Sequence, residues 1–309
     1  MTKLPTIIAT SVVRGAQKGD SHGGLYLVNL EDGRYTQVVD WATLDIEWEA
    51  SGRDRGLRGI SFYKGNIYIA SSGEVLVLNK KFQVIDRFRC GYMRMCHEID
   101  IWDDKLYITS TTFDSILIYD LIQKSFVCGF RIEYENKFPR CRTFDPNRED
   151  GPGACNLFHI NNVSATHGEI LFSGQKTNVL FGINDRGNLQ IKAIIPIGTH
   201  NVKRFNGGLL MNDTPNNNIL YTNKSSEFRY NIKKYNEEDI IVPEGDYIAR
   251  QQFGRGLTTW RNYIIGGSSP GTISIYGAGC PEPVRTVNIT MDIRNSIHGL
   301  EVWPFTEEE

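Results

Sequence analysis

The sequence predicts an all-β protein, a six-bladed β-propeller with four-stranded blades, formed as a single domain over residues 1–309. Three observations lead to this fold class. One strand pattern recurs six times, the turns between strands are short and polar or contain glycine, and no segment sustains the i, i+3, i+4 apolar spacing of a helix. The composition agrees, because 11% aromatic residues and 30 glycines favour strands and turns.

The repeat begins with a polar residue, continues through a short strand, and turns into a second strand. Its six copies open at Arg58, His97, Asn161, His200, Arg255 and His298. An aromatic residue five positions later sets the register in five copies (Tyr63, Trp102, Phe205, Trp260 and Trp303), whereas the third copy has Thr166 there. Successive openings lie 39, 64, 39, 55 and 43 residues apart, which suits four-stranded blades with loops of variable length.

The two ends of the chain complete one blade between them. The last copy provides only a first strand, in HGLEVWPF, while the N-terminal region provides three strands at Thr6–Val12, Gly24–Asn29 and Tyr35–Trp41. We therefore expect the C-terminal strand to be the innermost strand of a shared blade. This closure hides the sheet edges that an open array would expose.

Two segments are predicted to be long loops, residues 133–156 and residues 223–245, because they are rich in turn-forming and charged residues. The glycine-rich segment 266–271 is predicted to be a hairpin. A phosphate-binding loop would need a helix after it, and a strand pattern follows instead.

Charge and hydropathy exclude some classes of partner. Lys and Arg number 34 against 36 Asp and Glu, a net charge of −2. This balance argues against a protein of nucleic acid or of a membrane surface, since both need a basic face. No apolar run approaches the roughly 18 residues of a membrane span, and the first residues lack a secretory segment. We expect a cytoplasmic protein whose six cysteines, which show no CxxC spacing, are free thiols.

The opening residues of the copies should form a ring around the central channel. Three of the six histidines lie at ring positions, and His159 lies two residues before Asn161, on the same strand face. The first hypothesis is that His97, His159, His200 and His298 bind a divalent transition metal, with iron or copper favoured and zinc as the other candidate. Glu98 and Glu301 would then support the histidine rings from the second shell.

A second hypothesis needs no metal. Arg58 and Arg255 would bind an anionic group of a small-molecule substrate through their planar guanidinium forks, and the histidines would act as general acid or base. Asn161 and Asn201 are the candidate ligand-binding amides beside them. A third interpretation is structural, in which the polar ring only hydrogen-bonds water and backbone in a wet channel.

Several strings resemble a bacterial group of six-bladed propellers that brings no settled reaction to carry over. The strings are GLRGI, HEI, TTFDSI, HINNVS, GTHN, GGSSPGTISIY and IRNSIHGLEVWPF. The architecture is similar to strictosidine-synthase-like and gluconolactonase-like propellers, although the ring lacks the acidic ligand of the latter. The four histidines are similar in kind to the iron ligands of carotenoid oxygenases, an analogy of ligand type only.

These observations predict a metal-dependent enzyme that acts on a small organic molecule in the central channel. Its chemistry would be oxidative, or that of a lyase, cyclase or isomerase. The alternative is a non-catalytic propeller that binds a protein, a peptide or an anionic ligand through its top face.

Overall fold

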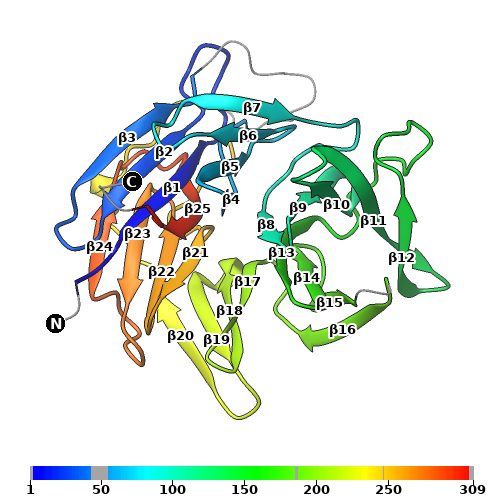
Figure 1. Ribbon diagram of the computed structural model, residues 1–309. Coiled ribbons are helices and arrows are strands. Elements are labelled where there is room, and N and C mark those ends of the chain that lie inside the picture. Colours follow the sequence, from blue (N-terminus) through cyan, green and yellow to red (C-terminus); the bar gives the residue numbers. More distant parts are fainter. Residues whose placement is uncertain (1–2, 43–54, 185–186, 246, 306–309) are drawn as a thin grey trace.

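Six antiparallel sheets follow one another around a common centre in the computed structural model, which describes residues 3–42, 55–184, 187–245 and 247–305 (Figure 1). Blade 1 contains β4 (Ile60–Tyr63), β5 (Asn66–Ala70), β6 (Val75–Leu78) and β7 (Val84–Phe88). Blade 2 contains β8 (Ile99–Trp102), β9 (Lys105–Ser110), β10 (Ser115–Asp120), β11 (Ser125–Glu135) and β12 (Phe138–Phe144). Blade 3 contains β13 (Ile160–Thr166), β14 (Glu169–Gly174), β15 (Val179–Asn184) and β16 (Leu189–Ile194).

The second half of the ring has the same plan. Blade 4 contains β17 (Thr199–Phe205), β18 (Gly208–Asp213), β19 (Asn218–Thr222) and β20 (Glu227–Asn231). Blade 5 contains β21 (Leu257–Trp260), β22 (Tyr263–Ser268), β23 (Thr272–Tyr276) and β24 (Arg285–Asn288). Blade 6 combines β25 (Asn295–Val302) with β1 (Thr6–Val13), β2 (Gly24–Asn29) and β3 (Tyr35–Asp40).

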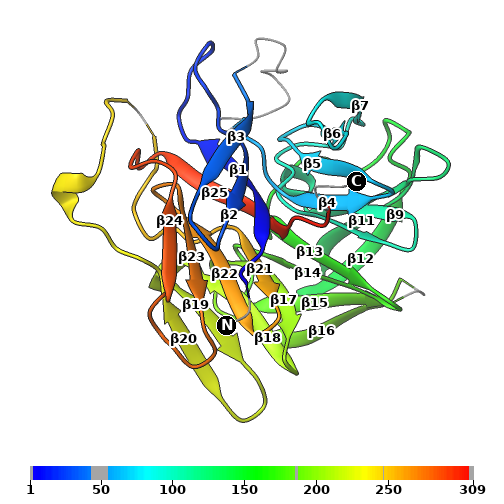
Figure 2. The ribbon, with the colours of Figure 1, turned by 60° about the vertical axis from the view of Figure 1, so that its left-hand side comes forward.

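Blade 6 confirms the predicted closure. Strand β25 pairs antiparallel with β1, with Ile7 opposite Val302 and Val13 opposite Asn295, and it is the innermost strand of its sheet. The first and last strands of the described chain therefore lie side by side (Figures 1 and 2). The predicted bounds of β2 are also confirmed, and 266–271 forms the β22–β23 hairpin.

The two predicted long loops are wrong in part, because each contains a strand. Strand β11 continues to Glu135, and β12 pairs with it as a fifth strand on blade 2. Within 223–245, β20 is the outer strand of blade 4, and the segment after it projects from the sheets with the short turn η3 (Glu237–Asp239) (Figure 2). The composition of these segments is rich in turn-forming residues and therefore predicts loops. Pairing with a neighbouring strand, rather than the local sequence, stabilises the two strands.

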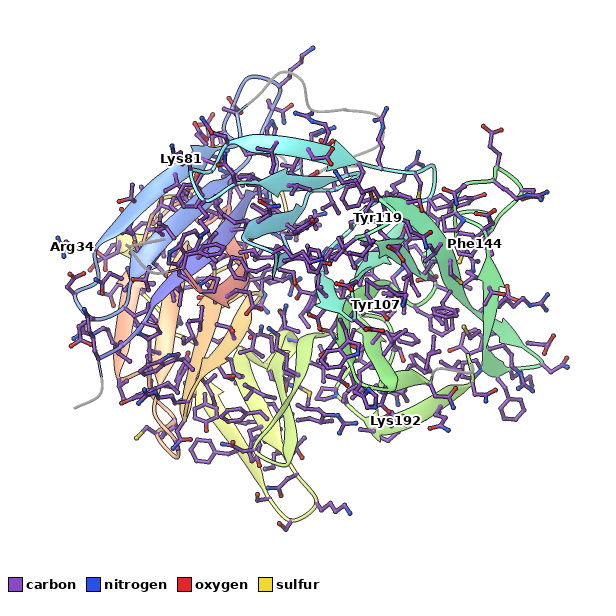
Figure 3. The ribbon with its side chains drawn as sticks, in the orientation of Figure 1. Arg34, Lys81, Tyr107, Tyr119, Phe144 and Lys192 are labelled. Carbon is purple, nitrogen blue, oxygen red and sulfur yellow. The ribbon has the colours of Figure 1, made fainter. Side chains whose placement is uncertain are left out.

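The core lies between neighbouring blades and consists of six apolar clusters. Residues that alternate along each strand point to the blade on either side, so every sheet contributes to two clusters. Between blades 1 and 2, for example, Phe88 stacks on Tyr119 with ring centroids 3.8 Å apart. Figure 3 shows Tyr107 and Tyr119 among the strands and Arg34 and Lys192 at the outer rim.

Helical structure is almost absent from the described residues, as predicted. It is limited to three short 3₁₀ turns, η1 (Thr111–Phe113), η2 (Thr214–Asn216) and η3. None of the described helices is long and apolar enough to span a membrane.

Candidate functional site

The innermost strands bring three of the four predicted histidines into contact. The ring centroid of His97, from blade 2, lies 5.7 Å from that of His159 and 5.5 Å from that of His298. Blades 2 and 6 lie on either side of blade 1, so the contact between His97 and His298 joins two blades that are not neighbours. The predicted convergence of imidazoles from separate sheets is therefore present for these three side chains.

His200 lies on the side of the site formed by blades 4 and 5. Its Nδ1 atom is 2.9 Å from Arg255 Nη1, 3.0 Å from the Gly198 carbonyl oxygen and 3.2 Å from Thr214 Oγ1. The Nε2 atom is buried and has no hydrogen-bond partner in the described part of the chain. Since Nδ1 is occupied, Nε2 is the nitrogen that this histidine offers to a ligand.

The next side chain of the site, His97, is notable for the hydrogen bonding of its ring. Both of its ring nitrogens are buried, and neither has a hydrogen-bond partner among the described residues. Buried polar atoms normally find partners, and each exception calls for an explanation, such as a catalytic role or a bound water or ion. Asn161 behaves in the same way, because its amide nitrogen and oxygen are both buried and unpartnered within the described ranges.

His159 is held in an uncommon backbone conformation, with a φ of 56°. The carboxylate of the buried Asp114 accepts the backbone N–H groups of Phe158 (3.1 Å) and His159 (2.8 Å) and thereby fixes this segment. The His159 Nδ1 atom lies 3.0 Å from Asn156 Oδ1. An amide oxygen only accepts, so Nδ1 carries the proton and Nε2 keeps its lone pair.

The two ring arginines are buried in the walls of the site. Arg58 Nη1 donates to Ser72 Oγ and to the Cys96 carbonyl oxygen, both at 3.1 Å. The guanidinium carbon of Arg255 lies 3.7 Å from the centroid of the Phe253 ring, and that of Arg14 lies 4.3 Å from it. Phe253 thus holds the guanidinium groups of Arg255 and Arg14 close to each other through cation–π contacts.

Burial and these cations keep the histidines neutral. Burial lowers the pKa of His97 and of His298, and Arg58 lowers both further. Burial lowers the pKa of His200 in the same way, with Arg255 as the next cause. For His159, burial followed by Lys176 lowers the pKa to about 4. The site therefore presents neutral imidazoles next to fixed positive charges.

The two predicted second-shell glutamates accept hydrogen bonds from residues other than the histidines. Glu98 accepts a hydrogen bond from Asn201 Nδ2, and Glu301 accepts one from Lys203 Nζ (2.9 Å) and one from Thr258 Oγ1 (3.2 Å). The physical reason is strand alternation, since residue 98 points to the opposite face from residue 97. These groups form a separate layer, in which burial raises the pKa of Glu98 to about 8.

Turns between the second and third strands of a blade position the ring residues of the next blade. Thr111 Oγ1, in η1, donates to the carbonyl oxygen of Ile160, directly before Asn161. Thr214 Oγ1, in η2, donates to the carbonyl oxygen of Gly254, directly before Arg255, at 3.0 Å. The ring is therefore held from one blade to the next at two equivalent places.

The arrangement of the side chains bears on the predicted metal. Imidazole nitrogens bind transition metals at about 2.0–2.1 Å. In the described part of the chain, however, no group of three or more His, Cys, Asp or Glu side chains is arranged to hold an ion. As placed, these side chains do not form a metal site.

Sequence reasoning missed several residues that shape the site. Asp114 and Thr214 lie in TTFDSI and in DTPN, strings that follow the second strands of blades 2 and 4, and that shared position is a usable signal. No sequence signal identifies Phe253, Arg14 or Asn156. Of the two histidines outside the predicted site, His22 is buried and His167 is exposed.

No family model matches the chain, and no curated protein does. Among solved structures, a chain of a nidogen/laminin complex is similar, with 8% identity, a TM-score of 0.58 and coverage of 96% of this chain and 97% of that one. A protein of unknown function from Bacteroides caccae is 13% identical, with a TM-score of 0.56 and coverage of 96% and 98%. A streptogramin B lyase has 11% identity, a TM-score of 0.45 and coverage of 73% and 70%. At these identities the likeness to the first two chains concerns the fold alone.

Proposed function

We propose that the histidine–arginine ring is the active site of an enzyme that transfers protons on a small anionic molecule, in a lyase or isomerase reaction. The observation that carries the proposal is the ring itself. The ring contains two buried guanidinium groups and several neutral imidazoles. It also contains buried polar atoms of His97, His200 and Asn161 that have no partner among the described residues.

The electrostatics of the ring favour an anion. Guanidinium forks match carboxylate and phosphate oxygens. The carboxylates of Glu98 and Glu301 are paired with Asn201 and Lys203, and that of Asp114 accepts backbone N–H groups. An anion placed between Arg58 and Arg255 would gain both charges in a site that burial shields from water.

The histidines and the arginines have different roles in the proposed reaction. His159 Nε2, with its lone pair free, accepts a proton from the carbon next to the substrate carboxylate. The electron pair left on that carbon moves into an enolate, whose negative charge the guanidinium groups stabilise. The protonated His159 then returns this proton to another carbon, which completes an isomerisation, or to a departing group as its bond to the substrate breaks, which completes an elimination.

The metal-dependent alternative concerns the same residues. The short ring separations from His97 to His159 and His298 favour it, whereas the arrangement of donors in the described residues does not. Elemental analysis of the wild-type protein and of His97→Ala/His200→Ala decides between the two versions, since near-stoichiometric iron, copper or zinc lost in the variant would replace the metal-free mechanism.

Calorimetric titration with malonate and with phosphate tests anion binding directly. We expect saturable binding by the wild type and a loss of about tenfold or more in affinity for Arg58→Gln and Arg255→Gln. Arg34→Gln, on the rim, is the matched control and should bind as the wild type does. Because the buried variants risk misfolding, each is checked by circular dichroism, and His97→Gln provides a smaller change in the same ring.

Proton linkage gives a second readout. An anion near the imidazoles stabilises their protonated forms, so binding should take up protons as the pH falls toward 5. Titrations in buffers of different ionisation enthalpy measure this uptake. A wild-type protein that binds neither anion, or binds them equally well without Arg58 or Arg255, would favour the non-catalytic propeller.

A further inference from the structure

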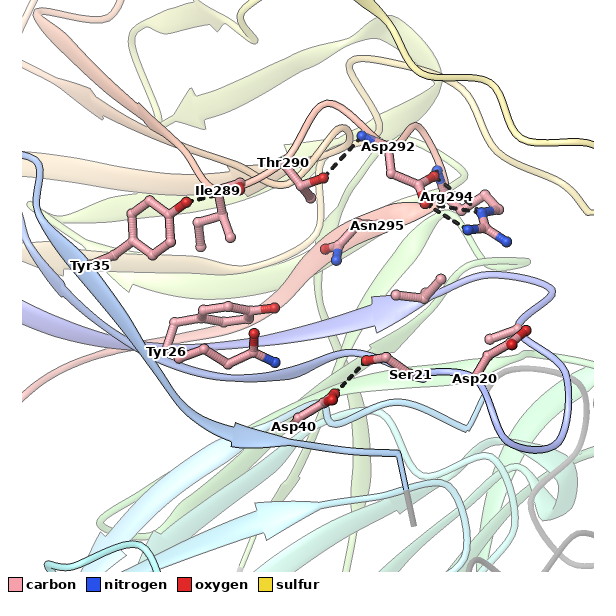
Figure 4. Close-up of a pocket in the computed structure, with 13 residues that line it drawn as sticks. Asp20, Ser21, Tyr26, Tyr35, Asp40, Ile289, Thr290, Asp292, Arg294 and Asn295 are labelled. Carbon is pink, nitrogen blue, oxygen red and sulfur yellow. Dashed lines mark hydrogen bonds and ion pairs between the residues drawn. The ribbon is translucent and has the colours of Figure 1, made fainter. Parts of the chain in front are cut away.

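A cavity of about 680 Å³ lies away from the histidine ring, on blade 6, within the size range of small-molecule sites. It is bounded by the β1–β2 loop, by β2 and β3, and by the connection from β24 to β25. Figure 4 shows Asp20, Ser21 and Asp40 on one side, Thr290, Asp292 and Arg294 on the opposite side, and Asn295 between them. We name this cavity the blade-6 pocket.

The charge of the blade-6 pocket is negative. Its one cation, Arg294, is neutralised by Asp292 through contacts of 2.7 and 3.1 Å. Asp20 and Asp40 have no ion-pair partner in the described part of the chain. Two uncompensated carboxylates therefore face the cavity from one side.

Two hydroxyl groups of the pocket wall already donate hydrogen bonds within the protein. Ser21 Oγ donates to Asp40 (2.5 Å), and the Tyr35 hydroxyl donates to the Ile289 carbonyl oxygen (3.1 Å). Asn295 lines the pocket, is 7% exposed, and has a buried Oδ1 atom with no partner among the described residues. This unpartnered amide oxygen is an observation independent of the acidic cluster.

Two aromatic rings complete the pocket. Tyr26 and Tyr35 meet edge to face, with centroids 6.5 Å apart, and Tyr35 is 44% exposed. Aromatic faces attract ammonium and guanidinium groups, but they are not ligands for hard inorganic cations, which prefer oxygen cages.

We infer that the blade-6 pocket binds a small organic cation that carries ammonium or guanidinium groups. Asp20 and Asp40 supply the charge, Tyr35 the aromatic contact, and Asn295 a buried acceptor. This site is separate from the ring in its residues and has the opposite charge, so it does not depend on the proposed function.

Titration of the full chain with spermidine and with agmatine tests this inference. We expect saturable, salt-sensitive binding by the wild type. Asp20→Asn/Asp40→Asn should weaken it by about tenfold, and Asp32→Asn/Asp103→Asn, which removes two exposed charges elsewhere, should not. Tyr35→Leu should weaken it less, and all variants should unfold at temperatures close to that of the wild type.

Three results would overturn the inference: no saturable binding of either amine, equal binding by the Asp20/Asp40 variant, or stronger binding of the neutral polyol sorbitol at the same site. His97→Ala separates the two proposals. It should bind both amines normally, while anion binding in the ring is weakened.

Discussion

Asn161 and Asn162 are neighbours in β13, yet their amides have opposite environments. Asn162 Nδ2 donates to the Val202 carbonyl oxygen at 3.3 Å, which joins blade 3 to blade 4. The Asn161 amide faces the ring and has no partner within the described residues. An unpartnered buried amide lowers the free energy of unfolding. We therefore assign the Asn161 amide to ligand binding rather than to stability.

This contrast predicts that Asn161→Leu leaves the free energy of unfolding unchanged or raises it by about 1 kcal/mol, while anion binding is lost. Asn162→Leu should instead lower it by about 1–3 kcal/mol, since a buried carbonyl loses its donor. Denaturant titration of both variants measures the difference. A large destabilisation by Asn161→Leu would assign this amide to the scaffold.

Glu98 predicts a pH dependence of stability. Burial raises its pKa from 4.5 to about 8, so between these values the folded protein keeps a proton that the unfolded chain has released. The folded state binds more protons, and stability falls as the pH rises through this window. Glu98→Gln, which cannot ionise, should therefore become more stable than the wild type near pH 8, by about 1–3 kcal/mol.

Thermal unfolding at pH 5 and pH 8 checks this result, with the exposed Glu237→Gln as control. Equal stability differences at the two pH values would mean that Glu98 is ionised in the folded protein.

Among the elements, the inner strands decide how closely the blades approach one another. A glycine follows the ring residue in β25, and a Cβ atom at Gly299 would lie 2.3 Å from the Arg58 carbonyl oxygen and 2.7 Å from Thr10 Oγ1. The Gly299 N–H donates to the same hydroxyl at 2.8 Å. The closing strand thus fits against blade 1 only without a side chain at this position.

We expect Gly299→Ala to lower the free energy of unfolding by about 1–3 kcal/mol or more, because backbone atoms cannot move aside without disturbing the ring. Gly153→Ala is the matched control, since no atom lies within 4 Å of its Cβ position. Denaturant titration distinguishes them, and equal stabilities would show that blades 6 and 1 separate easily.

The whole molecule depends on closure of the ring by β25. This strand pairs with β1 and contributes His298 to the site, and Ile297 and Leu300 join the core between blades 5 and 6. Without it, β1 becomes an exposed inner edge and that cluster loses part of its packing.

A chain that ends at Arg294 should therefore fail to unfold cooperatively and should not bind anions. Adding a peptide of residues 295–305 should restore a cooperative transition, as measured by circular dichroism. Cooperative unfolding of the truncated chain without the peptide would show that closure is not required for stability.

The sequence by itself determined the blade number, the shared blade and the ring positions, because strand alternation and repeat spacing are local properties of a chain. It also predicted that His97, His159, His200 and His298 converge, since equivalent strands of a closed ring face one axis; the rings of His97, His159 and His298 lie together, and His200 contacts Arg255. Only the tertiary structure decided which partners these side chains find. Glu98 bonds Asn201 rather than a histidine, Phe253 gathers the arginines, and the blade-6 pocket forms from three separate segments, because such contacts depend on distances between chain segments that no local pattern encodes.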